Sequence, residues 1–225
     1  MKEFKELEEL FESETIKPTF DYVHVILALF IFDENPNGIG RYRLKKELKI
    51  GEGTAKSLII KLNEKIRFIS LLDDNIRKGH VLTKRGKDFL NNIKEEIPFL
   101  TIGDTDMLEE IIIEVEDSSV CICQVKNRAD KISNGVAQRD AAIKIGGKGA
   151  SCIAFDGERL SFKLGPSSSD DQELMKIRSE IQEYFNNIII KENSMLDKND
   201  VIIIGLAKDP ETARLASLNA ALTLI

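Results

Sequence analysis

The stretch from Gly40 to Leu90 restricts the fold more than any other part of the sequence. Apolar residues recur at helical spacing over Arg41–Leu48, and again from Gly53 or Thr54 to about Arg67. A tight turn at 49–53, which contains two glycines, separates the two patterns. We therefore expect two helices joined by a short turn, in which the first helix braces the second.

The residues on either side of these two helices extend the pattern. A strongly apolar run, Phe20–Phe32, predicts a preceding helix. Two candidate strands, Phe68–Leu72 and His80–Thr83, surround a polar tip at 73–79, and a further helix is expected over Lys84–Glu96. Three helices followed by a hairpin are typical of a winged helix-turn-helix domain, in which the hairpin is the wing.

Charge is distributed unevenly along the chain. Residues 41–87 carry 14 basic and five acidic side chains, a local charge of +9 in a chain whose net charge is −6. Residues 1–100 have a net charge of +1, and residues 101–225 have −7. A positive region in an acidic protein is expected where a surface meets phosphates. We predict two domains, 1–97 and 106–225, joined by a linker at 98–106.

The residues expected to contact double-stranded DNA belong to the two central helices, the wing and the start of the closing helix. Thr54 and Ser57 could reach bases or phosphates, whereas Lys56 and Lys61 are expected to bind phosphates. Glu64 shares their helix face and has the wrong sign for DNA, so a protein-docking role for the domain stays open. The candidate DNA-contacting residues are Arg41, Arg43, Thr54, Lys56, Ser57, Lys61, Arg77, Lys78 and Lys84.

The N-terminal residues also follow a helical pattern. Phe4, Leu7, Leu10 and Phe11 recur at helical spacing, and glutamates fill the positions between them. This predicts a short amphipathic helix that ends before Pro18. The helix would either cover an apolar patch of its own domain or serve as a dimerisation arm.

The second half of the chain is expected to be an α+β domain with a mostly antiparallel sheet. Asp156 and Gly157 are a strong hairpin signal between two apolar runs, and Pro210 suits the first turn of a last helix. The small residues Ala213, Ala216 and Ala220 permit close packing of that helix, on its own sheet or in a dimer. The expected elements are strands at 108–116 and 120–125, a helix at 135–145, strands at 150–155 and 159–164, a helix at 170–186 with Ser169 as its N-cap, a strand at 201–207 and the last helix.

Polar residues of the second half could form an anion site at a helix start. The candidate ligand-binding residues are Arg128, Asn134, Gln138 and Arg139. A helix N-terminus with Arg and Asn nearby suits a small anionic effector, although a solvated helix face explains the same residues. The glycines at 146–149 follow a helix where a phosphate-binding loop must precede one, so we interpret them as a helix-to-strand turn.

The cysteines and histidines argue against a metal centre and against catalysis. Cys121, Cys123 and Cys152 lie in the second half, both histidines lie in the first, and no four-ligand zinc set results. Core thiols in a reduced cytoplasmic protein are the favoured interpretation. The longest apolar stretch, Tyr22–Phe32, is too short to cross a membrane. We expect no enzyme activity, no cofactor, no metal and no membrane partner.

The segment Gly40–Leu90, with Leu82, Thr83 and Gly86 in an LT-x-x-G pattern, resembles the winged-helix domains of archaeal and bacterial transcriptional regulators. Through Asn134–Leu160, the whole chain resembles uncharacterised archaeal winged-helix proteins with a C-terminal domain of unknown function. The resemblance and the charge together predict a cytoplasmic, homodimeric, DNA-binding transcriptional regulator whose C-terminal domain senses an effector or mediates dimerisation. The alternatives are a winged-helix protein-interaction module within a larger assembly and, third, an enzyme tethered to a winged helix.

Overall fold

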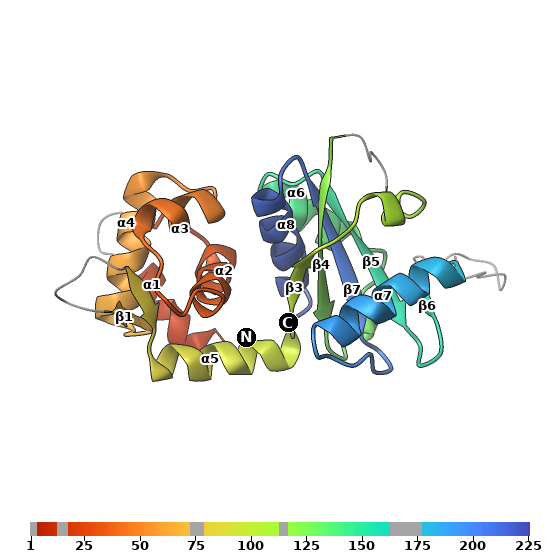
Figure 1. Cartoon of the computed structure of the whole chain (residues 1–225), viewed down its shortest axis with the longest axis horizontal. Helices are drawn as coiled ribbons and strands as arrows, with labels where there is room; N and C mark the ends of the chain where they lie inside the picture. The colour runs from red at the N-terminus through yellow and green to blue at the C-terminus, as the bar shows by residue number, and fades with distance from the viewer. Residues whose placement is uncertain (1–3, 13–17, 73–78, 113–116, 163–176) are drawn as a thin grey trace. The chain divides into compact units, whose positions relative to one another are not determined.

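The computed structural model describes residues 4–12, 18–72, 79–112, 117–162 and 177–225. The chain divides into two compact units, Met1–Lys94 and Glu95–Ile225, called unit 1 and unit 2 below (Figure 1). The division falls near the C-terminal end of one helix, α5 (Lys84–Glu96). Each unit is described by itself.

Unit 1 contains short helices and one two-stranded antiparallel sheet. Its strands pair Ile69 with Leu82 and Leu71 with His80, so both predicted strands are confirmed, within one residue at each end. The tip at 73–78, with Arg77 and Lys78, lies outside the described residues. In chain order the elements are η1 (Lys5–Leu7), α1 (Glu8–Phe11), α2 (Tyr22–Asp33), α3 (Arg41–Glu47), α4 (Glu52–Ile60), the π-helical stretch η2 (Lys61–Lys65), β1 (Ile69–Leu71), β2 (His80–Leu82) and α5.

Local sequence explains how α5 begins. Thr83 precedes the helix, and its hydroxyl oxygen accepts a hydrogen bond of 3.1 Å from the backbone N–H of Gly86. The same hydroxyl donates to the carbonyl of Arg67 at 2.7 Å, which ties the helix start to the end of η2. A Cβ at Gly86 would lie 2.1 Å from the carbonyl oxygen of Phe68, so only glycine permits this approach. The threonine and glycine of the LT-x-x-G pattern thus have a packing role.

Unit 2 contains a five-stranded sheet in which every neighbouring pair is antiparallel, so the expected α+β class and antiparallel sheet are confirmed for this unit. Its order is β3-β4-β7-β5-β6. The strands are β3 (Leu100–Ile102), β4 (Ser119–Val125), β5 (Gly149–Phe155), β6 (Leu160–Phe162) and β7 (Val201–Ala207). The helices are α6 (Val136–Lys144), α7 (Ser179–Lys191) and α8 (Pro210–Leu222), with 3-10 turns η3 (Asp106–Leu108) and η4 (Ala129–Lys131).

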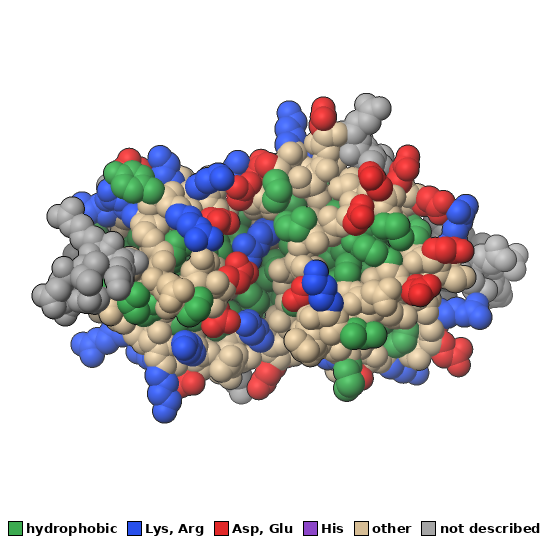
Figure 2. Space-filling view, viewed as in Figure 1, with side chains coloured by type: hydrophobic (Ala, Val, Ile, Leu, Met, Phe, Trp, Pro, Cys, Tyr) green, Lys and Arg blue, Asp and Glu red, His purple; other side chains and the backbone are tan. Residues whose placement is uncertain are grey.

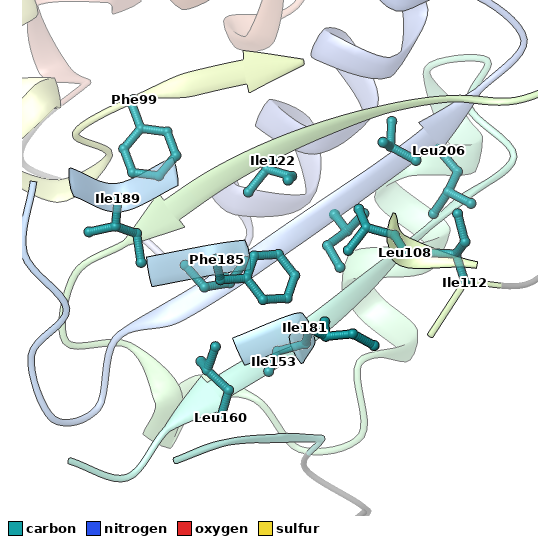
Figure 3. Packing of buried hydrophobic residues seen from close by; sticks show 13 residues of the cluster. Phe99, Leu108, Ile112, Ile122, Ile153, Leu160, Ile181, Phe185, Ile189 and Leu206 are labelled. Atoms are coloured by element: carbon teal, nitrogen blue, oxygen red, sulfur yellow. The ribbon is translucent and has the colours of Figure 1, made fainter. Parts of the chain in front are cut away.

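Helices cover both faces of this sheet. On one face, Ile181, Phe185 and Ile189 of α7 pack on alternate residues of the strands, among them Ile122 and Ile202 (Figure 3). α6 and α8 pack on the other face, against β4, β5 and β7 (Figure 1). The alternation of strand side chains between two apolar layers explains why β7 is buried along its whole length.

The small residues of α8 face the sheet of their own unit. A Cβ at Gly205 on β7 would lie 2.3 Å from the backbone nitrogen of Ser217, so helix and strand backbones approach closely. Ala213, Ala216 and Ala220 are fully buried. Of the two uses expected for this face, packing on the sheet is therefore correct, and the face is not an exposed dimer contact.

Three sequence predictions in this region were wrong. The expected linker at 98–106 contains β3, an edge strand of the sheet. The expected strand at 108–116 does not pair with β4: residues 106–108 form a 3-10 turn, 113–116 lie outside the described residues, and β4 pairs with β3 and β7. The helix expected from 170 begins at Ser179, and Ser169, its expected N-cap, lies outside the described residues.

Candidate nucleic-acid interface

Helix α4 has one buried and one exposed side. Ala55, Leu58 and Ile59 are buried. The opposite side forms an open groove of about 390 Å³ that continues along η2. The groove is lined by Gly53, Lys56, Ser57, Ile60, Lys61, Glu64 and Lys65. The face that sequence analysis assigned to DNA is therefore the accessible face of the helix.

Lys56 is the most available cation on this face. Its side chain is exposed, and within the described parts of the chain it makes no ion pair. Ser57, one residue later, is half-buried in the same groove. Lys84, at the start of α5, is also exposed. These three predicted DNA-contacting residues are therefore accessible to a ligand.

Two predicted arginine contacts already have acidic partners. Arg41 lies 3.2 Å from Glu52, at the start of α4, and Arg43 lies 3.5 Å from Glu47, one turn further along α3. Exposed ion pairs of this kind contribute at most about 1 kcal/mol, so phosphates could displace them.

Lys61 and Thr54, by contrast, are engaged with the N-terminal part of unit 1. The Lys61 ammonium donates to the carbonyl of Leu10 and lies 5.8 Å from the ring centroid of Phe20. Burial lowers the pKa of Lys61, and neighbouring Lys65 lowers it further. The Thr54 hydroxyl lies 2.6 Å from that of Thr19. Lys61 was expected to bind phosphate, but in the structure its ammonium instead contacts the C-terminal turn of α1, where a cation is favourable.

The N-terminal segment Phe4–Glu12 is itself well anchored. Leu7 and Leu10 are fully buried and Phe4 nearly so, and the ring of Phe4 lies 5.6 Å from that of Tyr22. Burial of each such side chain contributes about 1.5–3 kcal/mol, so detaching the segment would cost several kcal/mol. Of the two predicted uses, covering an apolar patch of its own domain agrees with this burial.

The one face of unit 1 that Figure 2 shows is not uniformly positive. On the face that Figure 2 shows, Lys and Arg side chains are interspersed with Asp and Glu. The accessible face of α4, rather than the local charge of +9 in the sequence, therefore marks the candidate interface.

The four predicted ligand-binding residues of unit 2 each have a different intramolecular partner. Arg128 pairs with Glu96 at 2.8 Å, and the Asn134 side chain accepts from the backbone N–H of Val136 at 3.1 Å. Gln138 donates to the Thr223 hydroxyl at 2.7 Å, and Arg139 lies 2.9 Å from its neighbour Asp140. None of these contacts joins two of the four residues.

A buried polar cluster at the start of β7 was missed by sequence reasoning. The fully buried carboxylate of Asp200 accepts hydrogen bonds from Gln124, Lys126, the backbone of Asn127 and the backbone of Asp197, at 2.7–2.8 Å. Burial lowers the pKa of Lys126, but hydrogen bonds to Asp197 and Asp200 outweigh that effect and raise it overall. The only available signal was an acid immediately before an entirely apolar strand.

The three cysteines are buried, as expected for core thiols. Burial raises the pKa of Cys123 to about 12 and that of Cys152 to about 12. Within the described ranges, no group of three or more His, Cys, Asp or Glu residues could hold a metal ion. Every described helix is too short or too polar to cross a bilayer.

Comparisons with known proteins agree with this architecture. Residues 116–224 match a family described as a domain of unknown function, DUF4443. The structure resembles that of a hypothetical protein, PH0730, from the archaeon Pyrococcus horikoshii OT3, with a TM-score of 0.66 and 20% sequence identity over 91% of this chain and 93% of that one. No curated protein matches the chain. The expected similarity to archaeal proteins with a C-terminal domain of unknown function is confirmed, and at this identity the likeness concerns the fold.

Proposed function

We propose that this chain is a regulator that binds double-stranded DNA and that unit 1 is its winged-helix domain. In this proposal α4 is the recognition helix, α3 braces it, and the β1–β2 hairpin is the wing. The order α2, α3, α4, β1, β2 supports the assignment. The observation that carries it is the open face of α4, where exposed Lys56 and half-buried Ser57 lie in one groove.

The size and chemistry of this face suit the major groove of DNA. The groove of B-DNA is about 12 Å wide and admits one helix. Lys56 would bind a phosphate, and the Ser57 hydroxyl would reach a base edge or phosphate from the first turns of the helix. Arg41 lies at the start of α3, beside the N-terminal end of α4 through its contact with Glu52, and could add a backbone contact.

A second candidate function is docking of a protein partner on the same face. Two features favour it: the side chain of Ile60, which lines the groove, is 40% exposed, and Glu64 lines the groove with a charge that phosphates repel. An exposed apolar side chain together with charges of both signs is usual for protein contacts.

Binding of the full chain to random-sequence duplex DNA distinguishes these functions. DNA binding predicts a rise in fluorescence anisotropy at micromolar protein and a log–log salt slope of about −0.9 for each phosphate contact. If the anisotropy does not rise even at a low salt concentration of about 50 mM, the DNA-binding function is excluded. Protein docking would then be the remaining proposal for the α4 face.

The roles proposed for unit 2 are homodimerisation or the sensing of a small anionic effector. If it dimerises, the surface must differ from the buried Ala213–Ala216–Ala220 face of α8. Sedimentation of the full chain at tens of micromolar tests this role, with a monomer as the contradicting result. Cytoplasmic location and the absence of enzyme activity stay predictions.

A further inference from the structure

The N-terminal segment Phe4–Glu12 lies against the C-terminal continuation of α4. The carbonyls of Leu10 and Glu9 accept hydrogen bonds from Lys61 and from Lys65, the latter at 3.4 Å. Glu6 adds an ion pair of 2.9 Å with Arg85 at the start of α5. Three cations close to the candidate interface are therefore bound to this one segment.

The segment is also strongly acidic on its outer side. Its apolar side chains point inward, whereas Glu6, Glu8, Glu9 and Glu12 are exposed. Lys5 is its one basic residue, so the net charge of residues 4–12 is −3. Four exposed carboxylates thus belong to a segment whose backbone is hydrogen-bonded to η2.

We infer that Phe4–Glu12 is a fixed acidic rim that confines DNA to the N-terminal half of α4 and weakens its binding. This inference rests on the proposed DNA-binding function. The buried Leu7 and Leu10 hold the rim in place, so DNA meets it as part of the surface rather than displacing it. Lys61 and Lys65 contribute to folding of unit 1 through their carbonyl contacts, and Lys56 remains as the phosphate ligand of the helix.

The rim acts through charge, so its effect must depend on salt. At about 0.1 M ionic strength the screening length is about 10 Å, comparable to the thickness of one helix. The carbonyl of Glu9 lies 3.4 Å from the Lys65 ammonium, so a phosphate that approaches this end of η2 comes within about one screening length of the α1 glutamates. At about 1 M salt the screening length falls to about 3 Å, and the repulsion disappears.

The test neutralises the rim without removing its apolar anchors. The variant Glu6→Gln, Glu8→Gln, Glu9→Gln, Glu12→Gln keeps Phe4, Leu7 and Leu10. A control with the same change of net charge in unit 2 is Asp130→Asn, Glu158→Gln, Glu180→Gln, Glu183→Gln, all exposed residues. Circular dichroism and thermal melting establish that both full-length variants are folded before anisotropy titrations with random duplex DNA.

The rim variant should bind at least about fivefold more tightly than wild type at 0.1 M salt, with the difference shrinking as salt rises. The control should change affinity less than about twofold under the same conditions. Equal gains in DNA affinity in both variants would show a general effect of net charge and would contradict a specific role of the rim. Unchanged affinity of the rim variant, with wild type still binding, would overturn the rim alone. If neither wild type nor either variant binds DNA, the proposed DNA-binding function is wrong, and so is the role proposed for the rim.

A second arm compares Lys56 and Lys61, two lysines that line the same groove. Lys61→Gln should leave DNA affinity within about twofold of wild type and lower the melting temperature, because it removes the contact with Leu10. Lys56→Gln should lower affinity and leave the melting temperature unchanged. An equal loss of affinity in both variants, without a loss of stability in Lys61→Gln, would show that DNA reaches past the rim.

Discussion

The two units use their charged side chains differently. In unit 2, the polar groups named above are turned toward the protein itself: Asp200 accepts four hydrogen bonds, and Arg128 and Gln138 are paired with Glu96 and Thr223. In unit 1, Lys56 on α4 remains exposed without an ion pair to any described residue. A predicted binding residue can meet a ligand only when folding leaves it accessible, and Lys56 of unit 1 meets this condition whereas Arg128 and Gln138 of unit 2 do not.

The units also differ in their titratable groups. Both histidines belong to unit 1, and all three cysteines belong to unit 2. Burial lowers the pKa of His24 and of His80, with Asp21 opposing part of the effect on His24, whereas burial raises the pKa of Cys123 and Cys152 to about 12. The two units should therefore respond to pH in opposite directions.

The largest expected difference in stability between the two units comes from substitutions of glycine. Gly205→Ala should destabilise unit 2 by about 3 kcal/mol or more, because the new Cβ would lie 2.3 Å from a backbone atom of α8. Gly53→Ala in unit 1 meets nothing within 4 Å and should be neutral or stabilising by up to about 1 kcal/mol. Hydrogen exchange followed by mass spectrometry reads the two units separately. Equal protection of β7 in wild type and Gly205→Ala would contradict the close packing.

Carboxylates give the next largest contrast. Asp200→Asn should destabilise unit 2 by about 3 kcal/mol, because it removes the charge that balances partly buried Lys126. The matched change in unit 1, Asp33→Asn, breaks a half-exposed pair with Lys94 at 2.7 Å and should cost less than about 1 kcal/mol. Urea unfolding measures both. Similar losses would show that the Asp200 cluster is not a structural anchor.

The pH responses are smaller and opposite in sign. The histidines of unfolded unit 1 bind protons near pH 6.5 while the folded ones resist protonation, so unit 1 should lose stability as pH falls below about 6.5. Unfolded thiols ionise near 9.0 and the folded ones near 12, so unit 2 should lose stability as pH rises above about 9, on the order of 1 kcal/mol per thiol by about pH 10. Hydrogen exchange corrected for intrinsic rates tests both directions. The substitutions His24→Gln with His80→Gln, and Cys123→Ala with Cys152→Ala, should remove the respective effects.

Long, regular patterns in the sequence predicted their elements well. The apolar run Val201–Ala207 is β7 without any shift of its ends, and the predicted helix Lys84–Glu96 is α5. Each pattern is long enough to bury one face or two continuously, so local sequence and tertiary packing favour the same structure.

Short and long-range features could not be predicted in the same way. β3 has three residues, and it joins the sheet through pairing with β4, which begins 17 residues after β3 ends. Likewise, nothing local indicates that Lys61 contacts Leu10, 51 positions earlier, or that Arg128 contacts Glu96. Such long-range contacts occupy predicted binding residues, because a side chain that suits a ligand also suits an internal partner.

We propose that the exposed face of α4 in unit 1 binds DNA and that unit 2 does not. The most direct test is the anisotropy of fluorescent duplex DNA with full-length wild type, Lys56→Gln on α4 and Lys144→Gln on α6, two substitutions that each remove one exposed cation. Lys56→Gln should lower affinity by about tenfold and reduce the magnitude of the salt slope by about one, whereas Lys144→Gln should match wild type. Equal affinity of all three proteins, or a larger loss in Lys144→Gln, would contradict the claim.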